Sequence, residues 1–201
     1  MSNKICISHN NSKLGADIPS VSMPVGVTCR PDAPCFSKCY ARKGRMAMKT
    51  VKEAYAGNLE AYRADPEFFF KYVSVMTRLN RFFRWHASGD IVDAQYFEGM
   101  IKVAQENPEV KYLCFTKKFA IVNAYLDAGK ELPQNLAVVF SAWGKGFKVD
   151  NPHNLPVTYV RFKKGDNSYI PEDAIPCGGR CYECVACWQL KKGQSIYFNE
   201  H

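Results

Sequence analysis

Apolar and polar positions along the chain follow two different periods, and the period changes from one segment to the next. Segments with apolar residues three and four positions apart have the spacing of amphipathic helices. Such segments begin at about Thr50, Asp65, Asp93 and Phe119. Two of these starts carry N-terminal signals: Thr50 and Glu53 have the spacing of a capping box, and Asp65 is followed by a proline at the first helical position. The pattern predicts four helices, the first two directly consecutive.

Short apolar runs, typical of strands buried on both faces of a parallel sheet, alternate with these helices. The predicted strands cover residues 20–28, 81–87, 110–116, 135–142 and 156–162. Because strands and helices alternate with short connections, we expect parallel strands joined by right-handed crossovers. About five strands are too few for a closed eight-stranded barrel. The expected fold is α/β: an incomplete (β/α) barrel with mostly parallel strands and a C-terminal cysteine-rich loop.

Length and composition indicate a single domain over residues 1–201. With 47% hydrophobic and 13% aromatic residues, the chain can bury a sizeable core. We expect an α/β core over 1–164, which includes a first cysteine loop at 29–39, and a metal-binding tail over 165–201. The N-terminal segment has no apolar run that suits a signal peptide, and no apolar run elsewhere is long enough to span a membrane. These features predict a cytoplasmic protein without a membrane partner.

Seven of the nine cysteines fall into two compact sets. The loop cysteines follow the first predicted strand with the spacing C-x5-C-x3-C, and they are Cys29, Cys35 and Cys39. The tail cysteines have the spacing C-x3-C-x2-C-x2-C, and they are Cys177, Cys181, Cys184 and Cys187. In a reducing compartment, cysteines this closely spaced are more typical of metal binding than of disulfides. We therefore expect all seven to be metal ligands.

The tail spacing favours iron over zinc. It is the ferredoxin-type order C-x2-C-x2-C-x3-C in reverse, and Gly178 and Gly179 can bring backbone amides close to sulfide. Zinc is the alternative, although structural zinc sites generally pair two C-x2-C knuckles across a longer insert. The expected cofactor is one or two [4Fe-4S] clusters, and the spacing leaves open whether the two sets form one site or two. Cys6 and Cys114 stand alone, and Cys114 is expected in the core.

Polar side chains stand where the predicted strands end. Ligands of parallel α/β sheets gather outside the carboxyl ends of the strands. The candidate catalytic residues at these ends are His86, Ser88, Asp90 and Lys117. The candidate cofactor-binding residues are Ser88, Asp90, Ser141 and Arg161. Each candidate has a structural alternative: His86 is as readily a buried histidine with a backbone partner, and Lys117 with Lys118 a solvated pair.

Three segments carry a resemblance to known proteins. TCRPDAPCFSKCYARKGR at 28–45, FRWHASGDIVDAQYF at 83–97 and CGGRCYECVACW at 177–188 together resemble the bacteriophage family called gene product 88-like over most of the chain. The strand ends Ser-Gly-Asp and Phe-Thr-Lys are also similar to those of small radical S-adenosylmethionine proteins related to spore photoproduct lyase. That second resemblance implies that the loop cysteines hold three irons of a [4Fe-4S] cluster, with the fourth iron open to S-adenosylmethionine.

Two functions from different classes follow. The first is a radical S-adenosylmethionine-like iron–sulfur enzyme, with the tail cluster in an auxiliary role. The second is a non-catalytic iron–sulfur or zinc protein that binds nucleic acid or a host protein through a basic surface. The net charge of +8, the small size and the absence of Gly-Gly-Glu after the second strand favour the second. The acid-free run from Lys38 to Lys52 is more typical of a solvated loop and helix start, while its place after Cys39 also suits an anionic cluster or a phosphate-bearing substrate. The ligand, a small molecule or nucleic acid, and the oligomeric state stay open. A phage gene would place the protein in the host-cell cytoplasm.

Overall fold

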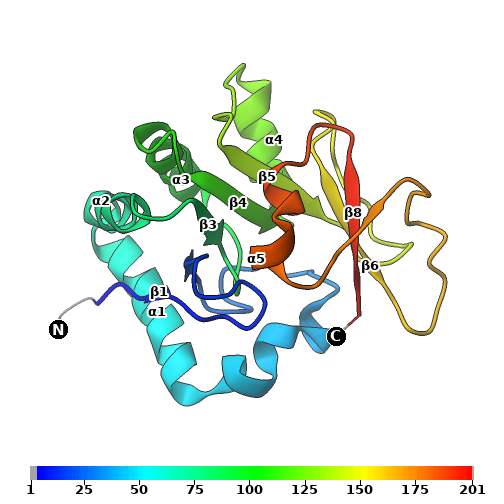
Figure 1. The fold of residues 1–201 in the computed structure, drawn as a ribbon, viewed down its shortest axis with the longest axis horizontal. Coiled ribbons are helices and arrows are strands. Elements are labelled where there is room, and N and C mark those ends of the chain that lie inside the picture. Colours follow the sequence, from blue (N-terminus) through cyan, green and yellow to red (C-terminus); the bar gives the residue numbers. More distant parts are fainter. Residues whose placement is uncertain (1–3, 201) are drawn as a thin grey trace.

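The computed structural model describes residues 4–200 and contains one eight-stranded sheet with the order β1-β2-β3-β4-β5-β6-β8-β7 (Figure 1). The strands are β1 (Ile7–Ser8), β2 (Ser20–Val21), β3 (Phe82–Trp85), β4 (Lys111–Thr116), β5 (Leu136–Ser141), β6 (Val157–Arg161), β7 (Ile175–Pro176) and β8 (Ser195–Asn199). The α-helices are α1 (Lys49–Ala64), α2 (Pro66–Thr77), α3 (Ala94–Glu106), α4 (Phe119–Asp127) and α5 (Cys181–Cys184). Four short 3-10 helices complete the described elements: η1 (Phe36–Lys38), η2 (Tyr40–Arg42), η3 (Gly44–Ala47) and η4 (Ala186–Trp188).

The sheet is mostly parallel, as predicted. β1 and β2 pair antiparallel, and every other neighbouring pair is parallel. Strands β2 to β6 follow one another in chain order, so their carboxyl ends share one edge of the sheet. Over residues 4–200 the sheet is open, with β1 and β7 as its outer strands. In the same part of the chain, no helix has the length and apolar character required to cross a membrane.

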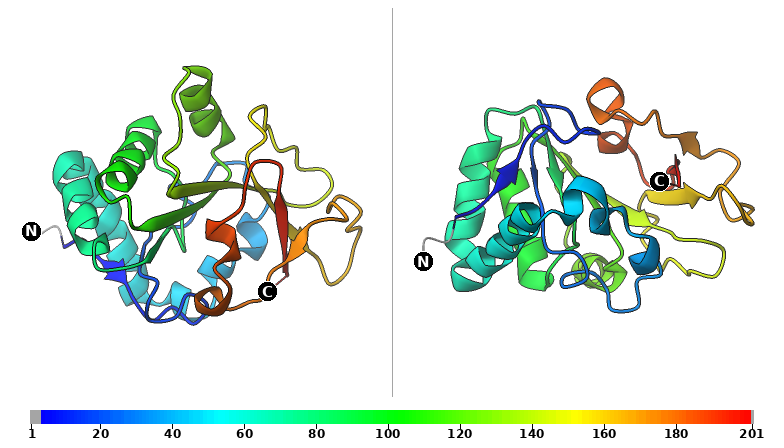
Figure 2. Two further views of the ribbon diagram at one scale, coloured as in Figure 1. Left: turned by 45° about the horizontal axis from the view of Figure 1, so that its top comes forward. Right: turned by 90° about the horizontal axis from the view of Figure 1, so that it is seen from below.

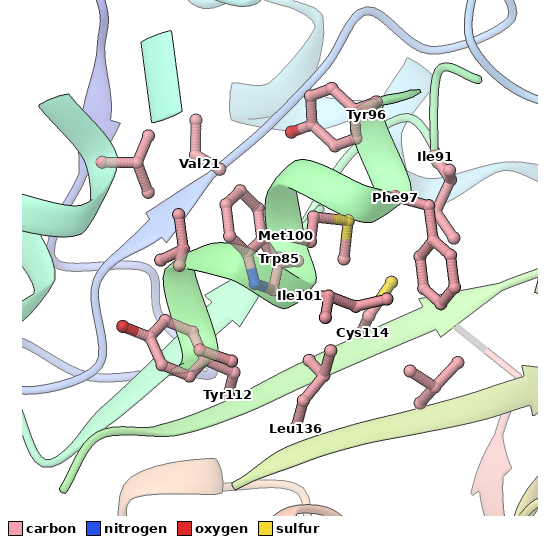
Figure 3. Packing of buried hydrophobic residues seen from close by; sticks show 14 of the residues in the cluster. Val21, Trp85, Ile91, Tyr96, Phe97, Met100, Ile101, Tyr112, Cys114 and Leu136 are labelled. Atoms are coloured by element: carbon pink, nitrogen blue, oxygen red, sulfur yellow. The ribbon is translucent and has the colours of Figure 1, made fainter. Parts of the chain in front are cut away.

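The two faces of the sheet are covered by different parts of the chain. Because side chains alternate along a strand, Phe83 and Trp85 of β3 pack with the helices, whereas Phe82 packs with the tail. On the helical face, Trp85 and Tyr112 lie under α3 in the main core (Figure 3). On the other face, buried residues of the strands meet Cys187 and Trp188. Figures 1 and 2 show α5 on the side of the sheet away from α3.

The predicted N-terminal cap is found in α2 but not in α1. The Asp65 side chain accepts a hydrogen bond from the Phe68 N–H and caps α2 as predicted. The predicted capping box of Thr50 and Glu53 is wrong: α1 begins at Lys49, with Met48 before it and no side-chain cap. Thr50 is therefore already inside the first turn, where its hydroxyl is not in the N-cap position. The chain enters α1 directly from η3, so the helix starts earlier than the capping pattern predicts.

The first predicted strand, 20–28, is too long. Only Ser20–Val21 pair as β2. The Val27 and Thr28 N–H groups bond back to the Pro24 carbonyl, and Gly26 has a φ of +79°. A proline that cannot donate and a left-handed glycine end the ladder, and the chain turns instead.

The tail is more than the predicted cysteine-rich loop. β8 pairs in parallel with β6 over five positions, and β7 adds to its other edge. These pairings raise the strand number above the predicted five, and β8 inserts between β6 and β7 out of chain order. Ile196 and Phe198 alternate toward the tail core, which is the only local sign of this strand in the sequence.

Candidate metal centre at the carboxyl edge of the sheet

The loop cysteines lie on the connection between β2 and α1, and this connection is tied to the end of β3 on both sides of the three thiols. The Thr28 hydroxyl, one residue before the first cysteine, accepts a hydrogen bond from the Asp90 N–H at 3.0 Å. The Tyr40 hydroxyl, one residue after the last, donates to the Ala87 carbonyl oxygen at 2.6 Å. The two anchors hold the loop cysteines at the carboxyl edge of the sheet.

The thiols of this set are close enough to affect one another's ionisation. Burial raises the pKa of the Cys29 thiol, and the hydrogen bond from the Gly26 N–H, at 3.4 Å, opposes that rise. The charges of Asp90, Cys35 and Cys39 raise it further. Ionising all three sulfurs together therefore requires a compensating positive charge, which a bound metal supplies.

Backbone amides and a lysine charge both favour the thiolate form of Cys39. Burial raises the pKa of its thiol, while the backbone N–H groups of Ala41 and Arg42 and the charge of Lys117 lower it. The amides come from η2, which begins directly after Cys39. Amide hydrogen bonds to sulfur are a recurrent means of stabilising a thiolate that carries metal.

Asp90 joins the loop to the ends of two strands. Its Oδ1 accepts hydrogen bonds from the Thr116 hydroxyl at 2.6 Å and the Ile91 N–H at 2.8 Å, and its Oδ2 accepts from the Lys117 N–H at 2.9 Å. Burial raises the pKa of this carboxyl, and the three donors and the Lys117 charge oppose the rise. The structure thus places this predicted ligand-binding residue where it positions the loop through its own N–H on Thr28.

His86 points into the main core. It is buried, with a φ of +58°, and its Nε2 lies 3.2 Å from the Tyr96 hydroxyl. Its Nδ1 lies 3.8 Å from the sulfur of Cys114, which is buried in the main core as predicted and lies beneath α3 in Figure 3. Burial, with a smaller effect of Arg84, lowers the pKa of His86 to about 3. The buried alternative matches this placement, with a hydroxyl rather than a backbone partner.

The other strand-end candidates take different positions. Ser88 is buried, and its N–H donates to the Ser22 hydroxyl at 3.3 Å. Ser141 ends β5 and is also buried. The Arg161 guanidinium lies over the Tyr197 ring of β8, with its carbon 5.5 Å from the ring centroid. Among the predicted strand-end residues, Lys117 is the one whose positive charge lowers the pKa of the Cys39 thiol.

The tail cysteines are brought together by a tight reversal at Val185. The Cys181 N–H donates to the Lys13 carbonyl, which starts α5 against the N-terminal segment. Val185, with a φ of +44°, ends α5 and donates its N–H to Cys181, so the chain turns back to Cys187. A left-handed β-branched residue costs about 1–3 kcal/mol and persists only where its surroundings impose it.

Cys187 is the most enclosed ligand candidate of the tail. Burial raises the pKa of its thiol to about 12, and Cys177 and Cys181 add to the rise. Trp188 beside it is buried, and its indole N–H donates to the Phe83 carbonyl at 3.1 Å. The tail cysteines are therefore fastened to the sheet face opposite the helices.

Arg84 lies on the tail face of β3, and no sequence pattern singled it out. Its guanidinium donates to the Trp85 and His86 carbonyl oxygens at 3.1 and 3.3 Å and stacks on Phe115 at 4.3 Å. Its charge opposes the rise in pKa that burial causes at Cys187 and also at Cys181. An arginine that alternates with buried aromatics inside a short strand was the available signal.

The two sets keep separate electrostatic neighbourhoods. The thiols that shift the pKa values of Cys29 and Cys39 are loop cysteines, and those that shift Cys181 and Cys187 are tail cysteines. All nine thiols are free. Over residues 4–200, no three or more His, Cys, Asp or Glu side chains converge as a ready-made metal site. Metal binding would thus require the thiols of each set to close inward.

The sequence profile of a family described as Gene product 88 matches residues 2–190. The chain belongs to the gene product 88 family. A search of curated proteins finds no match. The match spans both cysteine sets and the strand ends between them, so the family assignment covers the whole candidate centre of this gene product 88 protein.

A basic cavity adjoins the loop cysteines of this family member. It has a volume of about 630 Å³, and its cationic lining residues are Arg30, Lys117, Lys118 and Lys148. Arg30 directly follows Cys29, and Lys117 acts on Cys39, so both cations connect the cavity to the cysteine loop. Asp32 and Asp150 also line it, and Asp32 is paired with Arg30. The lining suits a small anion such as a carboxylate or a phosphate.

Proposed function

We propose that this gene product 88 protein is an iron–sulfur protein in which the loop cysteines hold a [4Fe-4S] cluster at the carboxyl edge of the sheet. The observation that carries the proposal is the double anchoring of their loop through Thr28 and Tyr40, on either side of three mutually interacting thiols. A loop held at both ends can present three sulfurs to one centre at a low entropic cost.

The donor set fits this group chemically. Soft thiolates select iron–sulfur clusters, zinc or copper(I), and a carboxylate- or histidine-based site would need other ligands. The Gly26 N–H toward Cys29, and the Ala41 and Arg42 N–H groups toward Cys39, supply the amide contacts that cluster sulfurs require. Three thiolates leave one iron of a [4Fe-4S] cluster without a protein ligand. That iron would bind S-adenosylmethionine, as the radical S-adenosylmethionine resemblance implies.

The topology supports an incomplete (β/α) barrel as the framework. Strands β2 to β6 are parallel and in chain order, and helices α1 to α4 cover one face. In such a framework the residues at the carboxyl ends face the same ligand. Lys117 would hold the anionic part of that ligand, because it lines the basic cavity and its charge acts on Cys39. Arg30 lines the same cavity but is paired with Asp32. Asp90 would keep the loop in register with β4.

The tail cysteines would form a second, closed site. Their four thiols can complete a cluster without an open position, and Trp188 beside Cys187 would shield it from solvent. Zinc is the alternative occupant, since four thiolates also suit a tetrahedral zinc ion. The separate neighbourhoods of the two sets favour two sites over one.

Anaerobic purification with iron, sulfide and zinc analysis tests the proposal. Two [4Fe-4S] clusters would give about eight irons per chain. The electron paramagnetic resonance spectrum of the reduced protein should change when S-adenosylmethionine is added, because the ligand would reach the open iron. A colourless protein with stoichiometric zinc alone would overturn the iron–sulfur assignment. A normal iron content with an unchanged spectrum would overturn only the S-adenosylmethionine part.

A further inference from the structure

The segment that carries the loop cysteines exposes large apolar side chains. Val27, Phe36, Tyr40 and Met48 are 63%, 45%, 49% and 56% exposed. Over the described residues, four of the ten large apolar side chains that are exposed thus fall within the stretch 27–48. Phe36 and Tyr40 lie in the consecutive 3-10 helices η1 and η2, so two of these exposed rings share one short segment. Exposed aromatic side chains gathered on one segment are a feature of interaction sites.

The same segment is strongly cationic. No acid occurs between Asp32 and Glu53, while Arg42, Lys43 and Arg45 are exposed. Over residues 4–200 these three cations take part in no ion pair, in contrast to Lys38, which pairs with Glu200 at 3.0 Å. Their charge is therefore available to an anionic partner.

The exposed rings are held in place. The Arg42 guanidinium stacks on the Phe36 ring at 4.3 Å and donates to the Phe36 carbonyl oxygen at 3.2 Å. The edge of the Phe36 ring also lies close to Gly26, where an added Cβ would come within 2.6 Å of the ring atom Cε2. Tyr40 is held by its hydroxyl on Ala87. Rigid aromatic and guanidinium planes offer stacking surfaces with little entropy left to lose.

We infer that Phe36, Tyr40, Arg42, Lys43 and Arg45 form a docking surface for single-stranded nucleic acid. Unpaired bases stack on exposed aromatic side chains, and phosphates are neutralised by neighbouring cations, so the two features of the surface match the two parts of this ligand. A duplex presents its phosphates but keeps its bases stacked, and it would leave the exposed rings without a partner. The inference does not depend on the proposed clusters, because none of the five residues is a proposed ligand.

Fluorescence anisotropy with labelled 20-nucleotide single-stranded DNA, single-stranded RNA and duplex DNA tests this surface on the protein as purified. Both single strands are arms of the experiment, and tighter binding of either one than of the duplex supports the inference. Binding of the duplex as tight as that of both single strands would overturn it, as would no binding of single strands at 100 mM salt and ~100 μM protein.

Two variants separate the stacking and charge contributions. Phe36→Ala should weaken single-strand binding about tenfold with an unchanged salt dependence, since stacking is worth about 1–3 kcal/mol per base. The triple variant Arg42→Gln, Lys43→Gln and Arg45→Gln should lower the slope of log affinity against log salt by about 2, at ~0.7 per phosphate contact. Phe36→Tyr keeps an aromatic ring at this position, so this variant should bind single strands about as tightly as the wild type.

The matched control removes the same charge elsewhere. Lys102, Lys191 and Lys192 are exposed and lie outside the cysteine loop, and their triple change to Gln should leave the slope nearly unchanged. An equal loss in both triple variants would mean that only net charge matters and would overturn the surface. If Phe36→Ala fails to fold, the comparison of the two triple variants decides the question. Iron and zinc content measured on each variant distinguishes a failure of this surface from a failure of the proposed metal centre.

Discussion

The Asp90 carboxylate accepts a hydrogen bond from the Thr116 hydroxyl at 2.6 Å, and this contact joins the connection that follows β3 to the end of β4. The same carboxylate accepts from the Lys117 N–H, and the Asp90 N–H donates to Thr28 beside the loop cysteines. A single buried side chain thus relates two strand ends to the cysteine loop.

Asp90→Asn should therefore destabilise the fold and loosen the loop. The amide can replace only one carboxylate oxygen as an acceptor, and its NH2 would face the Lys117 N–H or the Thr116 hydroxyl. We expect a loss of about 2 kcal/mol in the free energy of unfolding, measured by chemical denaturation. Asp173→Asn, at an exposed carboxylate, is the control and should change little. Equal stability of the two variants would remove the anchoring role from Asp90.

His86 should make stability depend on pH. Its folded pKa of about 3 lies below the ordinary value, because burial disfavours the imidazolium among Tyr96, Cys114 and the Arg84 charge. The unfolded chain binds the proton first, so this contribution to stability is complete above about pH 6.5 and falls by about 1.4 kcal/mol per pH unit between pH 6 and pH 4. Chemical denaturation at several pH values measures the slope.

His86→Asn is the test variant, since asparagine tolerates the positive φ. It should flatten the acid limb of the stability curve. His153→Asn serves as control, because His153 lies near the surface and bonds to Asp127 at 2.7 Å. A parallel acid limb in wild type and His86→Asn would show that His86 does not titrate as described.

Trp188→Phe should release the tail from the sheet. The change removes the indole donor to the Phe83 carbonyl and leaves a buried acceptor without its partner, at a cost of about 1–3 kcal/mol. The midpoint of thermal unfolding should fall, and Cys187 should react faster with a thiol reagent. Trp143→Phe is the matched control, because Trp143 is only half-buried and its ring contacts the edge of Phe162 and the Lys117 ammonium instead of the tail. If Cys187 reacts equally fast in the wild type and in Trp188→Phe, the Trp188 hydrogen bond does not hold the tail cysteines on the sheet.

Two serine variants should separate the cysteine sets. Cys35→Ser should remove about half of the bound iron and the response to S-adenosylmethionine, because it breaks only the proposed three-thiolate site. Cys184→Ser should also remove about half of the iron but keep that response. Cys6→Ser, at a solitary cysteine outside both sets, should keep all of the iron and also the response to S-adenosylmethionine. Loss of all iron in either variant would point to one shared site instead of two.

Local patterns predicted the elements whose signals are complete within a few residues. Asp65 with Pro66 starts a helix wherever it stands, and Asp93 caps α3 in the same way, through its side chain on the Tyr96 N–H. The apolar runs of β4 and β5 are strands because both faces are covered. β7 has only two residues and no apolar run, and β8 carries only the alternation of Ile196 and Phe198, since both strands are stabilised by neighbours distant in the sequence.

In the candidate site, too, local sequence patterns predicted some features, and the tertiary structure decided the others. Cysteine spacing identified the two sets, and the strand predicted over 20–28 located the loop set after the first strand of the parallel series, which is β2. The direction of His86 could not be predicted, because its left-handed backbone turns the ring from the strand end into the core. Arg84 was missed because its importance comes from its position on the tail face, which depends on where the tail packs.

By itself the sequence determined a mostly parallel α/β chain, four of its helices, and two groups of thiols at recognisable spacing. These follow from periodicity and short-range chemistry, which act between near neighbours. Only the tertiary structure decided that the tail crosses to the sheet face opposite the helices, that Thr28 and Tyr40 hold the cysteine loop, and that Phe36 stays exposed with the Arg42 guanidinium stacked on its ring. Those relationships join residues far apart in the chain, and they exist only once the sheet is assembled.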